Sequence, residues 1–176
     1  AVAMLESTPL AWRWPDNPVA RRYHMDDLPP DRQADVDWVT GAAMLVRSSA
    51  LAEVGLFDEG YFLYSEELDL CRRLAGAGWL VSYEPAAEVM HHEARSSDQV
   101  VAARHLWFHR SRVRYFRKHH GTGAAALVRG STLVQFAGAW LAEAARLAVG
   151  HKPVLRRRRM AAYAALLRDG LGWSAP

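Results

Sequence analysis

The chain has 176 residues, of which 51% are hydrophobic and 23% charged, a composition that allows one globular domain with a buried core and argues against intrinsic disorder. The single cysteine, Cys71, excludes an internal disulfide, and its apolar neighbours Leu70 and Leu74 predict a buried thiol in a reducing compartment, which favours the cytosol. The net charge of +3 is unevenly distributed, because residues 1–103 hold 8 Lys and Arg against 17 Asp and Glu while residues 104–176 hold 14 against 2, which implies two regions with different partners.

The acidic region predicts short strands and helices. Proline is frequent in residues 1–34, which indicates a segment dominated by loops. Residues 36–46 are almost continuously apolar and include β-branched side chains, as in a buried strand. We expect a short helix over residues 49–54, closed by Gly55 in a left-handed conformation, and then a turn at residues 57–60.

A second helix is predicted after Ser65, which is a good N-cap. Leu70, Leu74 and Ala77 recur at helical spacing before Gly78 ends the helix, so that Glu66 and Glu67 occupy its first turn. Residues 79–83 predict a strand that ends before Pro85, and an apolar pair at residues 89–90 leads into His91 and His92 at a further strand end.

The basic region predicts three helices. The first covers about residues 98–120, with Ser96 and Ser97 as caps, and ends at Gly121. The other two cover about residues 124–149 and 154–169, and Gly170 ends the last one.

Glu66 and Glu67 are the first candidates for chemistry. At a helix start, unpaired backbone N–H groups and the helix dipole keep a carboxylate ionised near neutral pH, which suits a general base. The alternative is that acidic residues at these positions only stabilise the helix, and this alternative is favoured when the feature is taken alone.

Histidines and paired aspartates offer weaker metal-binding patterns. His91 and His92 follow an apolar strand, but neighbouring residues of a strand point in opposite directions, so at most one faces a shared site. His105 and His109 are spaced i, i+4 without an evident third ligand. Asp35 and Asp37 match the pattern Asp-x-Asp, but they precede a predicted strand instead of ending one.

Several motifs in one order carry a family resemblance. They are Asp-Trp-Val-Thr-Gly-Ala-Ala-Met-Leu-Val-Arg (37–47), Val-Gly-Leu-Phe-Asp-Glu (54–59), Phe-Leu-Tyr-Ser-Glu-Glu-Leu-Asp-Leu-Cys-Arg-Arg-Leu (62–74), Gly-Trp (78–79), Pro-Ala-Ala (85–87) and His-His (91–92). From residue 37 to 96 the chain resembles the C-terminal half of the GT-A fold in family 2 glycosyltransferases, especially the bacterial rhamnosyltransferase-like branch. The resemblance implies an α/β, partial GT-A (nucleotide-diphospho-sugar transferase) fold with a C-terminal α-helical extension.

The resemblance also implies site residues. Glu67 matches the second acid of the family's Glu-Asp motif, the general base that deprotonates the acceptor hydroxyl, with Glu in place of the commoner Asp. Glu66 adjoins it, and Asp69 and Arg73 match the rest of that motif and brace the helix against the substrate site.

Two further sets of residues are implied in the same way. Gly41 and Ala42 match a turn of small residues where the backbone lies close to the donor sugar and the acceptor, and Trp38 and Thr40 flank it. His91 matches the strand-end His that completes the coordination of Mg²⁺ or Mn²⁺ in many relatives.

The implied reaction is an inverting transfer from a nucleotide-sugar donor to a saccharide or lipid-linked saccharide. We assign residues 1–121 to the acceptor side and the catalytic base of the GT-A domain. The family's nucleoside-binding strands and its own Asp-x-Asp motif have no counterpart that we recognise here. We therefore expect weak or absent donor binding by this chain alone.

We assign residues 122–176 to a basic amphipathic helical tail. The stretch 130–142 is apolar but about half the length needed to span a bilayer, which favours a helix lying on a surface. The arginines at residues 156–159 then attract anionic lipid, which places the protein in the cytoplasm or peripherally on the cytoplasmic face of the inner membrane.

Three alternatives to a membrane-bound enzyme remain open. In the first, the tail packs on the catalytic domain as a solvated basic helix. In the second, the tail binds nucleic acid through Trp107, Tyr115 and Tyr163, and this alternative ranks well below membrane contact. Otherwise the chain is a non-catalytic scaffold.

Overall fold

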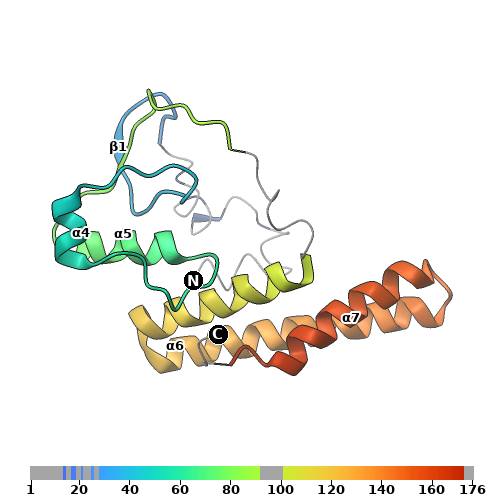
Figure 1. Cartoon of the computed structure of the whole chain (residues 1–176). Helices are drawn as coiled ribbons and strands as arrows, with labels where there is room; N and C mark the ends of the chain where they lie inside the picture. Colours follow the sequence, from blue (N-terminus) through green and yellow to red (C-terminus); the bar gives the residue numbers. More distant parts are fainter. Residues whose placement is uncertain are drawn as a thin grey trace.

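The computed structural model describes Trp14, Asn17, Pro18, Arg21, Met25, residues 28–91 and residues 101–172. Its elements are β1 (Ala34–Asp35), α4 (Ser48–Val54), α5 (Glu66–Gly76), β2 (Ser82–Tyr83), α6 (Val101–Ala148) and α7 (Pro153–Asp169). Figure 1 shows α4, α5 and β1 on one side, and α6 and α7 together on the other. Most of the N-terminal segment, His92 and the predicted caps Ser96 and Ser97 lie outside the described residues.

The sheet is much smaller than the sequence predicts. β1 and β2 pair in antiparallel fashion, with Ala34 opposite Tyr83 and Asp35 opposite Ser82. The predicted strand over residues 36–46 is wrong, since this stretch has no regular secondary structure, and the predicted strands near residues 79–83 and 89–91 are reduced to β2. The backbone N–H of Val36 donates to the carbonyl of Val81 (2.8 Å), but beyond this bond residues 36–46 form no strand ladder within the described residues, and Leu45 is left fully exposed.

The two predicted helices of the acidic region are confirmed, and they pack on each other. The buried side chains Ala50, Leu70 and Leu74 form their core, and partly buried apolar side chains surround it: Met44, Val46, Leu51, Val54 and Trp79. Cys71 is fully buried, as predicted. Gly55 ends α4 with a positive φ of 83°, but its ψ of 172° places it outside the left-handed helical region that we expected.

The first two predicted helices of the basic region correspond to the two halves of α6. Gly121 is non-helical, with φ 86° and ψ 171°, and divides α6 into a first half (residues 101–120) and a second half (residues 122–148). The halves run antiparallel, because Arg112 donates a hydrogen bond to Thr132 (2.7 Å) while the His109 and Phe136 rings lie 5.1 Å apart. At residue 121 glycine adopts the φ of 86° without the steric cost that a Cβ would bring.

The third predicted helix is α7, which returns along the second half of α6. Gly170 ends it with a φ of 66°, as predicted. Arg156 at the start of α7 bonds to Glu143 near the end of α6 (2.7 Å), and Arg129 bonds to the carbonyl of Gly170 at the opposite end (2.6 Å). The two halves of α6 and α7 therefore form a three-helix bundle, visible in Figure 1.

The bundle has its own core of five buried apolar side chains, Val113, Ala125, Val128, Leu166 and Leu171. Val113 precedes Gly121 and the other four follow it, so this core joins both sides of the boundary that we placed at residue 121. That boundary stays a prediction. Among the described helices, none is long and apolar enough to cross a membrane.

Candidate functional site

The first turn of α5 follows a strained turn. Ser65 is the N-cap, as predicted, but its hydroxyl makes no capping hydrogen bond. Tyr64 and Ser65 have φ values of 72° and 68°. Two consecutive residues with a side chain in this left-handed region cost free energy, and such strain persists only where surrounding contacts hold it. The turn sets the direction in which Glu66 and Glu67 leave the backbone.

Glu67 lies against Gly41, so the structure brings two predicted site residues together. A Cβ built on Gly41 would stand 3.6 Å from the Cβ and 3.9 Å from the carboxyl carbon of Glu67. The backbone N–H groups of Glu67, Leu68 and Gly41 lie near the Glu67 carboxylate and favour its ionised form. Its Oε2 atom is buried without a hydrogen-bond partner in the described structure, and so is Oε2 of Glu66. Each glutamate therefore has an oxygen whose hydrogen-bonding capacity is not used within the described residues.

Burial raises the pKa of Glu67 above its usual value, and the neighbouring charge of Glu66 adds to this effect. The backbone N–H groups act in the opposite direction but do not cancel it. A carboxylate with a raised pKa is a stronger base than an exposed one once it is ionised.

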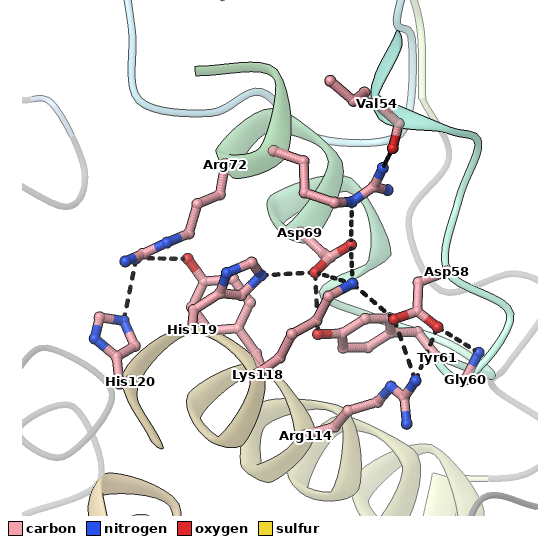
Figure 2. A network of polar contacts seen from close by, with 12 residues as sticks. Val54, Asp58, Gly60, Tyr61, Asp69, Arg72, Arg114, Lys118, His119 and His120 are labelled. Carbon is pink, nitrogen blue, oxygen red and sulfur yellow. Dashed lines mark hydrogen bonds and ion pairs between the residues drawn. The ribbon is translucent and has the colours of Figure 1, made fainter. Parts of the chain in front are cut away.

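Asp69 and Arg73 hold α5 in place (Figure 2). Asp69 is fully buried, and Arg73 Nε donates to its Oδ2 at 2.8 Å. The same guanidinium bonds to the carbonyls of Val54 and Leu56 at the end of α4. These contacts tie α5 to α4, and the assignment of Asp69 and Arg73 to the substrate site stays a prediction.

Three side chains from the first half of α6 complete this network, and their role was not predicted from the sequence. Lys118 Nζ lies 2.8 Å from carboxylate oxygens of both Asp69 and Asp58. His119 Nε2 lies 2.6 Å from Asp69, and Arg114 lies 2.8 Å from Asp58. Burial opposes the ionisation of both aspartates, but the hydrogen bonds that they accept keep the pKa of each below its usual value.

The other predicted site residues are less closely placed. Trp38 is half-buried, while Thr40, Ala42 and His91 are exposed. Across residues 28–91 and 101–172, no group of three or more His, Cys, Asp or Glu side chains gathers as a metal site would require. The metal role of His91 and the substrate roles of Trp38, Thr40 and Ala42 stay predictions.

His109 is a core residue. It is buried between the Phe108 and Phe136 rings, and burial lowers its pKa to about 3. This placement argues against metal binding by His109 together with His105.

The aromatic side chains considered for stacking on nucleic acid bases also serve packing. Tyr115 is buried and accepts a hydrogen bond from Arg72 (3.3 Å), and Trp107 packs on Phe62 with ring centres 4.7 Å apart. Tyr163 packs on Phe136. Because these rings face protein neighbours, the stacking surface proposed for nucleic acid is not supported.

One of the arginines at residues 156–159 is also used internally. Arg156 is buried and paired with Glu143, which also contacts Arg146 and Arg159. The expectation that all four arginines face a lipid surface is therefore wrong for Arg156. Arg157 and Arg158 are exposed.

A scan against family models matches residues 12–110 to the model described as "Glycosyltransferase like family 2". The curated relatives agree. An N-acetylglucosaminyl-diphospho-decaprenol L-rhamnosyltransferase of Mycobacterium tuberculosis is 42% identical over 107 residues, 61% of this chain and 34% of the relative. The rhamnosyltransferase WbbL of Escherichia coli is 39% identical over 83 residues, 47% of this chain and 31% of the relative.

A third relative extends the match further along the chain. The pre-mycofactocin glycosyltransferase of Mycobacterium tuberculosis is 33% identical over 135 residues, 72% of this chain and 27% of the relative. The chain thus spans about a third or less of the length of these relatives. No solved structure matches it.

Proposed function

Since the chain belongs to the glycosyltransferase-like family 2, we propose that it takes part in sugar transfer from a nucleotide-sugar donor, with Glu67 as the general base. Membership of this family implies a GT-A fold, of which the described residues form a mostly helical part with a small sheet. The observation that carries the proposal is the environment of Glu67. This residue lies in the first turn of α5 after a strained turn, is close to Gly41 and has a buried carboxylate oxygen without a hydrogen-bond partner in the described structure.

The proposed reaction is a single displacement. Oε2 of Glu67 accepts the proton of an acceptor hydroxyl as the hydroxyl oxygen forms a bond to the anomeric carbon of the donor sugar. The bond from that carbon to the nucleoside diphosphate breaks, and the electron pair leaves with the diphosphate. Attack on the face opposite the leaving group inverts the anomeric configuration. Because Gly41 has no side chain, its backbone lies close to the base, and a Cβ built there would stand 3.6 Å from the Cβ of Glu67.

The relatives' names suggest the substrates. Two of them are rhamnosyltransferases, and one acts, by its name, on an N-acetylglucosaminyl-diphospho-decaprenol. We propose a nucleotide-activated deoxyhexose as donor and a lipid-linked saccharide as acceptor. The chain matches only part of each relative, so both substrates are assigned to the full-length protein.

The resemblance also implies Mg²⁺ or Mn²⁺ bound through His91. The described residues do not form a metal site on their own, because His91 is a single ligand and no cluster of ligands gathers among them. No step above depends on the metal.

Replacing the proposed base tests the function. In the full-length protein, Glu67→Gln keeps the shape of the side chain and removes its ability to accept a proton. We expect kcat to fall by roughly 10²- to 10⁴-fold, measured as transfer from nucleotide-activated rhamnose to a polyprenyl-diphosphate-linked N-acetylglucosamine. Glu66→Gln is the matched control, because it changes the adjacent carboxylate, and we expect a much smaller loss. Unchanged activity of Glu67→Gln would exclude the proposed base.

The pH dependence gives a second reading of the same base. Glu67 acts only when ionised, so activity rises as the pH rises through its pKa. Because burial raises that pKa, the acidic limb should lie above the ordinary glutamate value of about 4.3. A limb at or below that value would contradict the assignment.

We further propose that the turn between α6 and α7 contacts an anionic membrane. Its apolar side chains are exposed: Val149 by 80%, Val154 by 66% and Leu155 by 40%. Arg157 and Arg158 are exposed beside them. From residue 101 to 172 the chain has two carboxylates, Glu143 and Asp169, and both are paired with arginines. This cationic surface with exposed apolar side chains is complementary to anionic lipid.

The turn lies at the end of the bundle that is far from α4 and α5, as Figure 1 shows. We expect the chain to sediment with phosphatidylglycerol vesicles and less with phosphatidylcholine vesicles. The double change Val149→Ser and Val154→Ser should reduce sedimentation several-fold. Leu127→Ser, at a side chain 66% exposed elsewhere on α6, should leave it unchanged. Retention on RNA without binding to vesicles would support the nucleic-acid alternative instead.

A further inference from the structure

The segment that leads into α5 lies along the first half of α6. The rings of Phe62 and Trp107 are 4.7 Å apart between centres, and those of Tyr64 and Phe108 are 5.7 Å apart. Further along, Arg72 of α5 bonds to Tyr115 of α6 (3.3 Å). The turn before α5 and α5 itself therefore rest on the same helix.

On the N-terminal side of Glu67, one hydrogen bond holds the strained turn. Ser111 is buried on α6, and its hydroxyl donates to the carbonyl of Leu63 at 2.7 Å. Leu63 directly precedes Tyr64 and Ser65, whose positive φ values require outside contacts to persist. Ser111 therefore fixes the carbonyl from which the left-handed turn starts.

On the C-terminal side of Glu67, ion pairs hold the helix. Figure 2 shows Lys118 and His119 approaching the buried carboxylate of Asp69 from α6. Lys118 also contacts Asp58 (2.8 Å), so one ammonium group joins α5 to the turn at residues 58–60. Burying a carboxylate without a partner costs free energy. The pairing of Asp69 with Lys118 and His119 therefore holds α5 against the first half of α6.

Ser111, Lys118 and His119 lie just beyond residues 12–110, the part that matches the family model. We infer that the first half of α6 is the positioning element for Glu67, with Ser111 and Lys118 holding the backbone on either side of it. This inference rests on the proposed function, in which Glu67 is the base. Neither residue is proposed to touch the substrate.

The two contacts act on the geometry of the base. Lys118 reaches Asp69, two residues after Glu67, and Ser111 reaches Leu63, four residues before it. When these contacts are lost, the first turn of α5 relaxes and the carboxylate moves relative to the acceptor hydroxyl. Displacement of a catalytic group by about 1 Å costs up to about 10²-fold in rate. Groups that bind the substrate elsewhere are unaffected, so the effect falls on kcat.

The experiment compares four variants of the full-length protein. Lys118→Met removes the ammonium group, Lys118→Arg restores a cation, and Ser111→Ala removes the hydroxyl. Arg168→Met is the matched control, because Arg168 is an exposed cation of the bundle whose hydrogen bond goes to its own helix. We expect kcat to fall about 10-fold or more in Lys118→Met and Ser111→Ala, with KM within about two-fold. Lys118→Arg should recover most of kcat, and Arg168→Met should match the wild type.

Amide hydrogen exchange supplies a readout that does not need activity. In Lys118→Met and Ser111→Ala, residues 66–70 should exchange at least about 10-fold faster, while residues 125–128 in the bundle core stay unchanged. Equal acceleration in both segments, or no change in kcat, would overturn the inference, because either result indicates a general effect on stability or none on the base.

The failure of the inference and that of the proposed function are distinguishable. If Lys118 acts through Glu67, Lys118→Met should change the residual activity of Glu67→Gln by less than about two-fold. If Glu67→Gln is as active as the wild type, the proposed base is wrong, and exchange at residues 66–70 alone decides whether α6 positions α5. Unchanged exchange there would then refute the positioning role.

Discussion

Two regions of the chain satisfy the hydrogen-bonding groups of their backbones in different ways: the three-helix bundle of residues 101–172 and the α4–α5 region of residues 28–91. Each helix of the bundle closes its hydrogen bonds within itself and buries one face against its neighbours. In residues 28–91, long stretches have no regular secondary structure and only four residues pair as strands. Exposed apolar side chains mark these stretches: Leu45, Leu80, Val89 and Met90. Local structure forms from local sequence, whereas extended structure needs a neighbouring strand.

The largest effect is expected in the core of the bundle. Leu166 is 4% exposed and packs in the cluster with Val113 and Val128. Leu166→Ala should lower the free energy of unfolding by about 3 kcal/mol, measured by denaturant titration. Leu141→Ala, at a side chain 62% exposed, should change it by less than about 0.5 kcal/mol. Similar losses in both variants would show that the bundle is not packed as described.

Asp69 tests the junction between the two regions. Asp69→Asn keeps the shape of the side chain but leaves Lys118, Arg73 and His119 without their shared carboxylate. We expect a loss of about 2 kcal/mol in the free energy of unfolding. Asp31→Asn at an exposed position should be neutral within about 0.5 kcal/mol. A neutral Asp69→Asn would mean that the ion pairs of Asp69 do not stabilise the junction.

Acid should loosen the same junction. The pKa values of Asp58 and Asp69 are lowered in the folded protein, so their contribution to stability is complete above the unfolded-state value of about 3.9 and is lost as the pH falls below it. Thermal unfolding measured from pH 6 to pH 2 should show this loss. The loss should be smaller in Asp69→Asn, and an equal loss would assign the acid sensitivity to other groups.

A change at Gly60 tests the turn at residues 58–60, where Asp58 binds Arg114 and Lys118 of α6. A Cβ at this position would clash with the guanidinium group of Arg114. Gly60→Ala should displace that flexible side chain from Asp58 and cost about 1 kcal/mol in the free energy of unfolding. Arg114→Met should cost a similar amount, and the double variant should cost little more than either single one. Additive losses would show that Gly60→Ala destabilises the protein independently of the ion pair between Arg114 and Asp58.

The smallest effect is expected in the extended stretch. Leu45 is fully exposed in this chain, so Leu45→Asn should change the free energy of unfolding by less than about 0.5 kcal/mol. Leu70→Asn, at a side chain 1% exposed, should be strongly destabilising. A large cost at Leu45, in this chain or in the full-length protein, would show that another segment covers it.

Sequence reasoning succeeded where the signal is local. Glycines and helical spacing predicted α4, α5, α7 and the division of α6, because Gly55, Gly78, Gly121 and Gly170 lie within a residue or two of the segment that they end. It failed for the strand over residues 36–46, since apolar and β-branched side chains show β propensity but not the presence of a partner strand.

The roles of the site residues stay predictions, but their placement can be compared with the sequence. The motif resemblance pointed to Glu67 and Gly41, and the structure brings these two residues close together. The side chains that hold Asp69 were not recognised, because Lys118 and His119 are 49 and 50 residues away in the sequence. Basic side chains at the C-terminal end of a helix are ordinarily explained by their favourable interaction with the helix dipole. Their pairing with a buried carboxylate follows from tertiary packing.

Cys71 gives α5 a built-in chemical reporter. It is the only cysteine of the chain, it lies on the helix that carries Glu67, and it is fully buried, which raises the pKa of its thiol. A thiol-labelling reagent therefore reacts only when this helix lifts away from its neighbours, so the labelling rate measures how often it opens. Substrates that close the site should slow the labelling of Cys71, and a single mass measurement would follow it without any engineered label.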